Sequence, residues 1–350
     1  MEASASKGRV KSPARRDVGT ASRTERGLPR RGSAAGSAYR PQLALLVNRP
    51  PTGPQWIHEL KLDGYRIGIV ISRGKARLIS RNHADWTDDF PEIATAAAEL
   101  GAPSAVIDGE LVVLDAKGVS SFEALQKRAE SREGLTYFAF DLLSLGGRDL
   151  RRQPLIERKR QLKALLRTRV RRIRYTEHVD TEGEKVLRQA CVHGAEGIIS
   201  KCRSAPYRSA ARHPDWQKTK CIKRQEFVIG GFTEPDGTRE GIGALLIGYY
   251  EGRRFAFAGK VGTGRGWNNT FSLALRKRLE AIEVKTCPFD PPPKGGLRKH
   301  AHWVKPRTVV EVEFTEWTAG GHIRHPSLQG IRIDKKATEV VRETPVLVER

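Results

Sequence analysis

The most informative segment of this chain is Glu59-Leu60-Lys61-Leu62-Asp63-Gly64-Tyr65-Arg66. Lys61 stands at the end of an apolar run, Asp-Gly follows as a turn signal, and Arg66 enters the next apolar run. This pattern predicts two strands joined by a tight turn, with the lysine either solvated or held at a reactive site. An amine is a useful nucleophile only when its pKa, usually about 10.4, is lowered by burial or by neighbouring cations.

A second group of cations lies near residue 220. In the run Trp216-Gln217-Lys218-Thr219-Lys220, the two lysines are two positions apart, so a strand places both on one face. We expect Lys218 and Lys220 to bind a phosphate group and to lower the pKa of Lys61.

Between these two segments the sequence predicts a mixed domain. Short apolar runs bounded by turn residues predict strands over residues 56–60, 65–72, 76–80, 105–114 and 137–145. Helices are predicted over residues 90–100, 121–129, 155–166 and 182–193. The strands and helices do not alternate regularly, which favours the α+β class over a doubly wound parallel sheet.

The pattern changes after Lys223. Strands are predicted over residues 226–232, 244–251, 254–261 and 309–317 and near Ile331, with one helix over residues 273–283. Several short strands with a single helix are typical of a small oligonucleotide-binding (OB-fold) β-barrel. We therefore place one domain at residues 41–223 and an OB-fold domain at residues 224–343.

The chain is strongly basic, with 63 Lys and Arg against 40 Asp and Glu and a formal net charge of +23. Such a charge predicts a polyanionic partner, most commonly nucleic acid. Residues 1–40 hold ten Lys and Arg, three acids and one aromatic residue, Tyr39. With so little apolar content they are expected to form a disordered basic arm.

The remaining composition suggests a cytoplasmic protein. No apolar stretch approaches the roughly 18 residues of a membrane span, and no signal-peptide core begins the chain. The four cysteines form no CxxC pair, and in that compartment they are expected to be reduced, mostly buried thiols. They are Cys191, Cys202, Cys221 and Cys287.

The ordered motifs resemble the ATP-dependent DNA ligases within the covalent nucleotidyltransferases. Lys61 to Arg66 match the pattern KxDGxR, and the WxKxK run ends at Lys220. The other matching motifs, in chain order, are Ser80-Arg81-Asn82, Asp108-Gly109-Glu110, Tyr137-Phe138-Ala139-Phe140-Asp141, Glu196-Gly197-Ile198-Ile199-Ser200-Lys201, Arg324-His325-Pro326 and Arg332-Ile333-Asp334-Lys335. The resemblance spans residues 40–340 and implies an ATP-grasp-like nucleotidyltransferase (adenylation) domain followed by an OB-fold domain.

The resemblance also implies how each residue acts. Lys61 attacks the α-phosphate of ATP, which releases pyrophosphate and leaves AMP on the amine, and Lys218 and Lys220 contact that phosphate. Glu196 and Glu110 are the expected ligands of Mg²⁺ or Mn²⁺. Arg66 and Glu110 are expected to bind the ribose, Phe140 to stack on the adenine, and Glu59 and Leu60 to line the nucleotide site. At the nick, Arg81 is expected to bind the 5′-phosphate, and Asp63 to orient the sugar or the 3′-hydroxyl. The residues expected to orient pyrophosphate are Arg324, Arg332, Asp334 and Lys335.

One position departs from the family pattern. His83 stands where relatives usually have Gly after Ser-Arg-Asn, and a β-carbon there restricts the turn that presents Arg81.

Within the family, the compact plan is similar to the ligase domain of bacterial non-homologous end-joining proteins. The resemblance implies nicked or broken duplex DNA as substrate, a Ku-type end-binding protein as partner, a monomer, and a place at the bacterial nucleoid. No large N-terminal DNA-binding domain is expected, nor room for polymerase and nuclease domains. An RNA ligase or an mRNA capping-type nucleotidyltransferase is the alternative enzyme, and a non-catalytic DNA-binding module is the alternative of another class.

Overall fold

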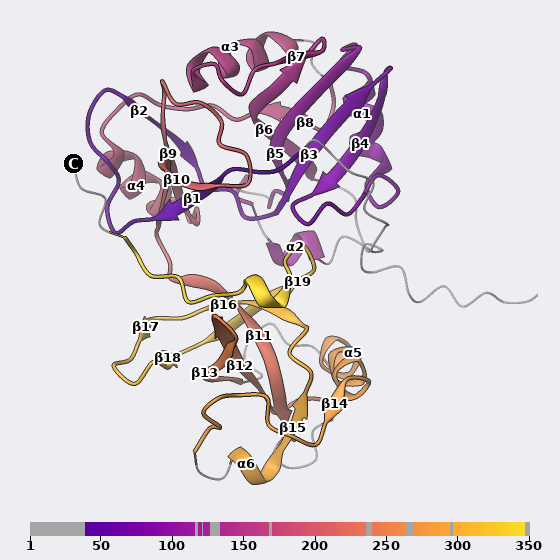
Figure 1. Cartoon of the computed structure of the whole chain (residues 1–350), viewed down its shortest axis with the longest axis vertical. Coiled ribbons are helices and arrows are strands. Elements are labelled where there is room, and N and C mark those ends of the chain that lie inside the picture. The colour runs from indigo at the N-terminus through magenta and orange to yellow at the C-terminus, as the bar shows by residue number, and fades with distance from the viewer. Residues whose placement is uncertain are drawn as a thin grey trace, which may run out of the picture.

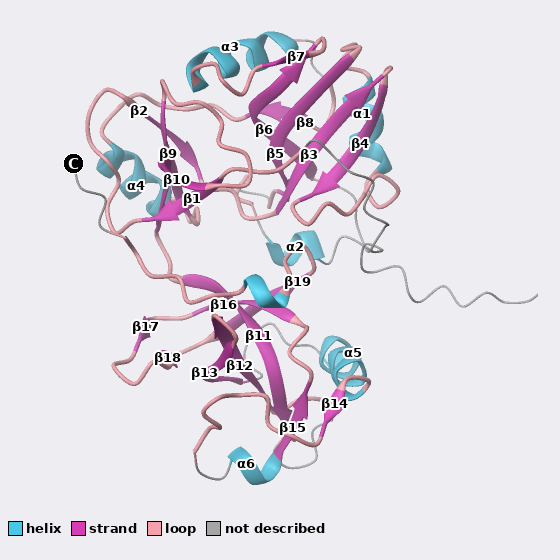
Figure 2. Cartoon of the chain, viewed as in Figure 1, coloured by secondary structure: helices cyan, strands magenta, loops and turns pink. Residues whose placement is uncertain are grey.

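The structure, a computed structural model, describes residues 39–115, 118–120, 122–126, 134–167, 170–235, 240–262, 269–294 and 297–346. The predicted arm over residues 1–38 therefore lies outside the described residues, as do residues 121 and 127–129 of one predicted helix. Figure 1 shows two lobes, with strands of the C-terminal part below those of the N-terminal part. Both lobes consist mainly of strands with fewer helices (Figure 2), as the predicted α+β class requires.

The larger sheet of the N-terminal domain has the strand order β4-β3-β5-β6-β7, with β8 parallel to β6. Ile67, Ile69 and Ile71 alternate along β3 and are buried beneath the covering helices, because every second side chain of a strand faces the same side. The elements are β3 (Tyr65–Ser72), β4 (Lys75–Ser80), α1 (Pro91–Ala98), β5 (Ser104–Val113), α2 (Phe122–Gln126), β6 (Leu135–Leu145), β7 (Arg148–Asp149), α3 (Leu155–Leu165) and β8 (Ile173–Tyr175).

A second sheet of the same domain has the order β1-β10-β9-β2. It comprises β1 (Leu43–Leu46), β2 (Trp56–Leu60), β9 (Gly197–Cys202) and β10 (Arg212–Lys220), with α4 (Gly183–Val192) beside β2 and β9. In β9, Ile198 lies opposite both Leu60 and Thr219. This register brings the residue that follows β2, Lys61, to the same end of the sheet as the lysines of β10.

The C-terminal domain has its own apolar core, built around Phe227, Leu245 and Val310. Its main sheet has the order β13-β12-β11-β15-β14, and β16 joins β11 to β19. No helix in the described part of the chain has the length and apolar character that a membrane crossing needs. The elements are β11 (Arg224–Thr233), β12 (Ala244–Glu251), β13 (Arg254–Gly262), α5 (Asn269–Glu280), β14 (Glu283–Val284), α6 (Leu297–His300), β15 (Ala301–Val304), β16 (Val309–Glu313), β17 (Glu316–Trp317), β18 (Ile323–Arg324), β19 (Ser327–Arg332) and the 3-10 helix η1 (Ala337–Glu339).

Most predicted elements occur where the sequence places them. The strands predicted over residues 56–60, 65–72 and 244–251 have the same limits in the structure. The single strand predicted over residues 309–317 is instead two strands, because β16 pairs with β11 while β17 pairs with β18. The short strands β1, β8 and β15 were not predicted, since each is defined by a partner distant in sequence.

Tyr39, which the sequence analysis placed at the end of the arm, packs into the folded domain. Its side chain is completely buried, and its hydroxyl donates a hydrogen bond of 2.7 Å to Asp108. The ring lies directly over Gly68, where an added Cβ would come within 2.4 Å of it. A lone aromatic residue among polar neighbours carries no periodic signal, so its long-range contact could not be read from local sequence.

The expectation of four reduced, mostly buried thiols is wrong. Cys191 at the end of α4 and Cys221 after β10 form a disulfide, with their Cα atoms 5.3 Å apart. Cys202 and Cys287 take part in no disulfide and are only partly buried. The pair was missed because the fold brings together two residues that are separated by 30 positions in the sequence.

Candidate active site

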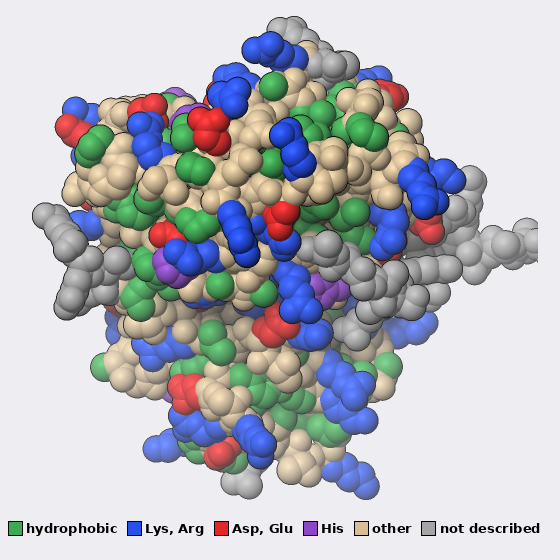
Figure 3. Space-filling model, turned by 45° about the horizontal axis from the view of Figure 1, so that its top comes forward, with side chains coloured by type: hydrophobic (Ala, Val, Ile, Leu, Met, Phe, Trp, Pro, Cys, Tyr) green, Lys and Arg blue, Asp and Glu red, His purple; other side chains and the backbone are tan. Residues whose placement is uncertain are grey.

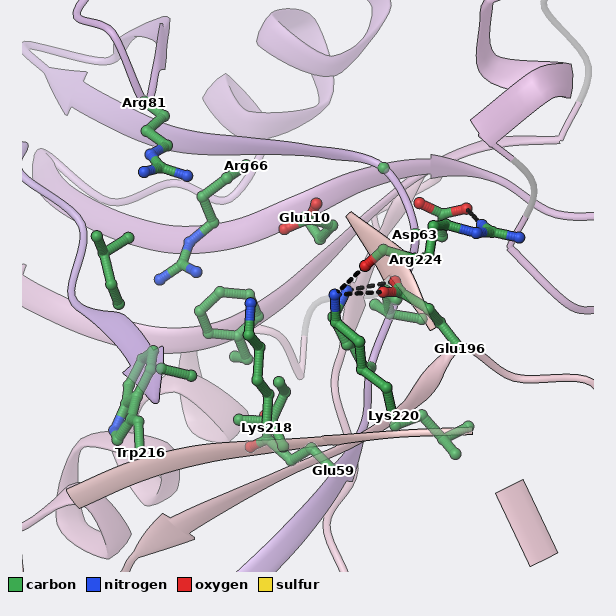
Figure 4. Close-up of a pocket in the computed structure, with 18 of the residues that line it drawn as sticks. Glu59, Asp63, Arg66, Arg81, Glu110, Glu196, Trp216, Lys218, Lys220 and Arg224 are labelled. Carbon is green, nitrogen blue, oxygen red and sulfur yellow. Dashed lines mark hydrogen bonds and ion pairs between the residues drawn. The ribbon is translucent and has the colours of Figure 1, made fainter. Parts of the chain in front are cut away.

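One pocket collects most of the residues that the sequence analysis singled out. It lies between the two sheets of the N-terminal domain and is closed on one side by the C-terminal domain. Figure 4 shows side chains of Arg66, Glu110, Lys218 and Lys220 lying around the same space. The lining residues from the N-terminal domain include Glu59, Leu60, Lys61, Asp63, Arg66, Arg81, Glu110, Phe140, Glu196, Lys218 and Lys220, and those from the C-terminal domain include Arg332, Asp334 and Lys335.

Lys61 is held at the end of β2 by β9 and by an acid. Its backbone N–H donates to the carbonyl of Gly197 at 2.9 Å, and its Nζ forms an ion pair with the carboxylate of Glu196. The expected lowering of the Lys61 pKa is wrong for this arrangement. Burial and Lys220 lower the pKa, but Glu196 and Asp63 outweigh them, so the pKa of Lys61 is raised. A ligand that takes Glu196 away from the amine would remove the main cause of that rise.

The two lysines of β10 both reach the pocket, as their spacing predicted. Burial, and then the charge of Lys220, lower the pKa of Lys218 to about 8. The Nζ atoms of both lysines meet one carboxylate, that of Glu343, at 2.6 Å for Lys218 and 3.0 Å for Lys220. Nothing in the sequence singled out Glu343, which lies after the last element of the C-terminal domain.

Arg66 is fixed by a buried acid. Its guanidinium donates two hydrogen bonds, of 2.6 and 2.7 Å, to the two carboxylate oxygens of Asp108, and its Cζ lies 4.5 Å from the ring centre of Phe140. Asp108 also accepts hydrogen bonds from the hydroxyls of Tyr39 and Tyr207 at 2.7 and 2.6 Å. Asp108 was quoted only as part of a motif, and the structure makes it the residue that positions Arg66 beside the aromatic ring.

Asp63 points toward the linker between the domains. Its Oδ2 accepts a hydrogen bond of 2.6 Å from Arg224, the first residue of β11 (Figure 4). Arg224 also pairs with Glu313 at 3.1 Å. Burial raises the pKa of Asp63, and so does the charge of Glu196. In this conformation the Asp63 carboxylate is therefore engaged by the C-terminal domain and not free to meet a substrate hydroxyl.

The C-terminal domain contributes Arg332, which bridges the two domains. Its guanidinium pairs with Asp334 at 2.8 Å and Glu311 at 3.0 Å, and it donates to the carbonyl of Gly64 at 3.2 Å. Lys335 pairs with Glu226 at 3.2 Å. The hydrogen bond to Gly64 holds the segment Arg332–Lys335 against the turn that follows Lys61.

The structure does not bring Arg324 to the pocket. It lies on the small β17–β18 hairpin, pairs with Glu316 at 2.9 Å, and has a side chain that is 61% exposed. The resemblance of its motif implied that Arg324 orients pyrophosphate together with Arg332, but the two residues belong to different sheets.

The turn after β4 accommodates the unusual His83. This residue adopts a positive φ of 62°, the left-handed conformation that glycine takes most readily. The turn closes through a hydrogen bond of 2.9 Å from the N–H of His83 to the carbonyl of Ser80. Arg81 still lines the pocket, so the β-carbon has not displaced it.

Glu59 and Leu60 precede Lys61 in β2 and have different surroundings. Glu59 is buried and its carboxylate accepts hydrogen bonds from Lys159 at 2.5 Å and Lys201 at 2.6 Å. Burial opposes its ionisation, but the two lysines outweigh burial and lower the pKa of Glu59. Leu60 is 52% exposed although it is apolar. Its side chain thus offers an accessible apolar surface next to the nucleophile candidate.

Two carboxylates that line the pocket are the candidates for holding a divalent cation. Glu196 Oε1 is buried without a hydrogen-bond partner, and burial raises the pKa of Glu110 to about 7. The residues that the structure describes contain no group of three or more His, Cys, Asp or Glu side chains suited to a metal. Mg²⁺ commonly uses only one or two carboxylates together with substrate phosphates and water, so Glu196 and Glu110 fit it.

Comparison with known proteins agrees with this geometry. A family model described as "ATP dependent DNA ligase domain" matches residues 41–220, and one described as "ATP dependent DNA ligase C terminal region" matches residues 238–335. The chain belongs to the ATP-dependent DNA ligase family. The predicted family is thereby confirmed.

Two curated relatives place the chain within this ligase family. It is 42% identical over 342 residues to the multifunctional non-homologous end joining protein LigD of Pseudomonas aeruginosa, covering 91% of this chain and 40% of that protein. It is 37% identical over 290 residues to the multifunctional non-homologous end joining DNA repair protein LigD of Mycobacterium tuberculosis H37Rv, covering 83% of this chain and 38% of that protein. The chain thus spans about two fifths of the length of these curated ligase relatives.

A solved ligase structure shares the fold. The protein described as "mycobacterial DNA ligase D complexed with ATP and MES" superposes with a TM-score of 0.62 and 35% sequence identity, covering 86% of this chain and 98% of that one. Together with the two family matches, this similarity confirms the predicted order of a nucleotidyltransferase domain followed by an OB-fold domain.

Proposed function

We propose that this protein is an ATP-dependent DNA ligase that seals nicks or breaks in duplex DNA through an AMP–lysine intermediate on Lys61. The observation that carries the proposal is the convergence, in one pocket, of Lys61, the paired lysines of β10 and Arg332 from the other domain. A surface hairpin lysine would have no reason to lie half-buried in one pocket with a carboxylate, two further lysines and an interdomain arginine.

The pocket residues divide the first step of this reaction among them. Once its ammonium has lost a proton to solvent, the Lys61 amine attacks the α-phosphorus, the bond to pyrophosphate breaks, and AMP remains joined to the nitrogen. Lys218 and Lys220 offset the charge on the α-phosphate, as cations must in phosphoryl transfer. Arg332 and Lys335, which line the pocket from the C-terminal domain, would orient the departing pyrophosphate. Mg²⁺ or Mn²⁺ held by Glu196 and Glu110 would supply further positive charge at the phosphates.

We propose the other nucleotide contacts from the resemblance, on residues that line the same pocket. Phe140 is the proposed ring for adenine, and Arg66, fixed by Asp108 and 4.5 Å from that ring, is the proposed ligand of the ribose. Glu110, which lies opposite Arg66 in the β3–β5 ladder, is the second proposed ligand of the ribose. Arg81, on the rim, remains the candidate for the 5′-phosphate of the nick.

The later steps require the domains to separate. In the closed arrangement Asp63 is paired with Arg224, and Arg332 donates to the carbonyl of Gly64, so both groups are engaged across the domains. Opening at the linker after β10 would free Asp63 for the nick. Lys and Arg side chains spread over both lobes on the face in Figure 3 provide the positive charge that duplex DNA needs.

The relatives suggest the biological setting. Because both curated relatives are named for non-homologous end joining, we infer that the chain acts in repair of broken DNA, with a Ku-type end-binding protein as its partner. Its site of action would be the bacterial nucleoid in the cytoplasm, and we expect it to work as a monomer.

The direct test is nick sealing with defined polymers. The protein should become covalently labelled by ATP carrying a labelled α-phosphate, much less by the GTP equivalent, and should seal a nicked DNA duplex in the presence of Mg²⁺ or Mn²⁺. Efficient use of GTP or of nicked RNA in preference to DNA would instead support the capping-enzyme or RNA-ligase alternative. Binding of DNA without any covalent label would support a non-catalytic DNA-binding module.

Nucleotide binding should weaken at alkaline pH because of Lys218. The pKa of Lys218 is lowered to about 8, so the amine is charged below that pH and loses its charge above it. One pH unit above the pKa, only about a tenth of the amine is protonated, and ATP affinity should fall about tenfold. ATP binding would be titrated across this range with a Lys61→Ala variant, which keeps the chemistry silent. Adding Lys218→Arg should abolish the decline, and an equal decline in both proteins would contradict the assignment.

A further inference from the structure

Residues 340–346 run from the C-terminal domain to the nucleotidyltransferase domain, and we call them the strap. Val340 is completely buried in the core of the C-terminal domain, and its carbonyl accepts a hydrogen bond of 2.7 Å from the N–H of Tyr250. At the other end, the N–H of Val346 donates to the carbonyl of Leu46 in β1 at 3.0 Å. The strap is therefore attached to both domains.

The middle of the strap is held by the side chain of Gln225, which is 3% exposed. The amide oxygen of Gln225 accepts a hydrogen bond of 2.9 Å from the N–H of Glu343, and its Nε2 donates to the carbonyl of Val341 at 3.2 Å. Both polar ends of one buried side chain are thus used to fix the backbone around Glu343. This backbone fixation directs the carboxylate of Glu343 into the pocket.

The Glu343 carboxylate occupies the position between the two lysines of β10. Lys218 donates to one of its oxygens at 2.6 Å and Lys220 to the other at 3.0 Å. Its side chain is only 18% exposed. Burial opposes ionisation, but Lys218 and Lys220 hold the pKa of Glu343 at about 2, so the group is an anion at neutral pH. The two carboxylate oxygens accept hydrogen bonds from the two ammonium groups in the same way that two non-bridging oxygens of a phosphate would.

We propose that Glu343 is an internal competitor for the α-phosphate of ATP, and that the strap controls how readily the enzyme loads its nucleotide. The inference rests on the proposed function, in which Lys218 and Lys220 bind that phosphate. A carboxylate and a phosphate cannot share this space, because both are anions that need the same donors and would repel each other at contact distance. ATP therefore binds productively only when Glu343 has moved away.

The proposal can be tested by removing the charge of Glu343 and keeping its shape. In Glu343→Gln, the ATP concentration that gives half the maximal rate of enzyme adenylation should fall about tenfold, and the maximal rate should change by less than about twofold. Glu339→Gln is the matched control: it makes the same charge change at an exposed position in η1, just before the strap. It should leave both quantities unchanged.

Equilibrium binding separates competition from effects on chemistry. ATP should bind about tenfold more tightly to Lys61→Ala/Glu343→Gln than to Lys61→Ala alone. Unchanged or weaker ATP binding would overturn the proposal, since it would mean that Glu343 shares the lysines with the nucleotide or helps to position them. The proposed function is checked separately by Lys218→Ala: if that change leaves ATP binding intact, the lysine pair is not the phosphate site and the premise itself fails.

Discussion

Replacing Lys61 with alanine should abolish the covalent labelling of the enzyme by ATP, with a loss of more than roughly a thousandfold in the rate of adenylation. No other amine described in the pocket lies at the junction of β2 and β3 with its backbone hydrogen-bonded to Gly197. Lys218 and Lys220 are held by Glu343, and Lys201 is directed to Glu59. The measurement is the amount of AMP bound to denatured protein after incubation with labelled ATP and Mg²⁺.

The control for this prediction is Lys75→Ala, because Lys75 is an exposed lysine at the start of β4. It should be labelled like the unaltered protein. Thermal unfolding of Lys61→Ala should show that the fold survives, since the change removes a partly exposed side chain, not a core residue. A covalent label of normal intensity on Lys61→Ala would disprove the assignment of the nucleophile.

Replacing Arg332 with alanine should separate the first step from the last. Arg332 joins Asp334 and Glu311 to the carbonyl of Gly64, so its loss removes both a cation near the departing pyrophosphate and a contact that closes the domains. Loss of one preorganised donor in such a site lowers a rate by about 100- to 1000-fold. We expect that loss in enzyme adenylation, and less than about a tenfold loss when the same variant seals a nick already carrying AMP.

Two further arginines show whether the effect depends on position. Arg254→Ala removes an exposed arginine of the same domain that pairs with Glu251, and it should leave both steps unchanged. Arg324→Ala should resemble Arg254→Ala, because Arg324 lies on the exposed β17–β18 hairpin. Equal losses in adenylation and sealing for Arg332→Ala would show that Arg332 only stabilises the closed structure.

The sequence alone was sufficient for the elements and residues whose signals are local. Short apolar runs bounded by turn residues predicted β3 and β12 with the observed limits, because such runs indicate segments that are buried in the fold. The spacing of Lys218 and Lys220 predicted their common face, since side chains two positions apart in a strand point the same way. The ordered motifs around Lys61 predicted the family, and the structure brings most of these motif residues to one pocket.

Tertiary structure alone decided the remaining features, all of which depend on contacts between distant residues. Tyr39 joins the folded domain through Asp108, 69 positions away, and Glu343 meets Lys218 across 125 positions. The pKa of Lys61 rises because the fold pairs its amine with Glu196, which, with Asp63, outweighs burial and the charge of Lys220. Local patterns carry burial and backbone preference, but the energy of an ion pair depends on the distance between charges. That distance exists only once the chain has folded.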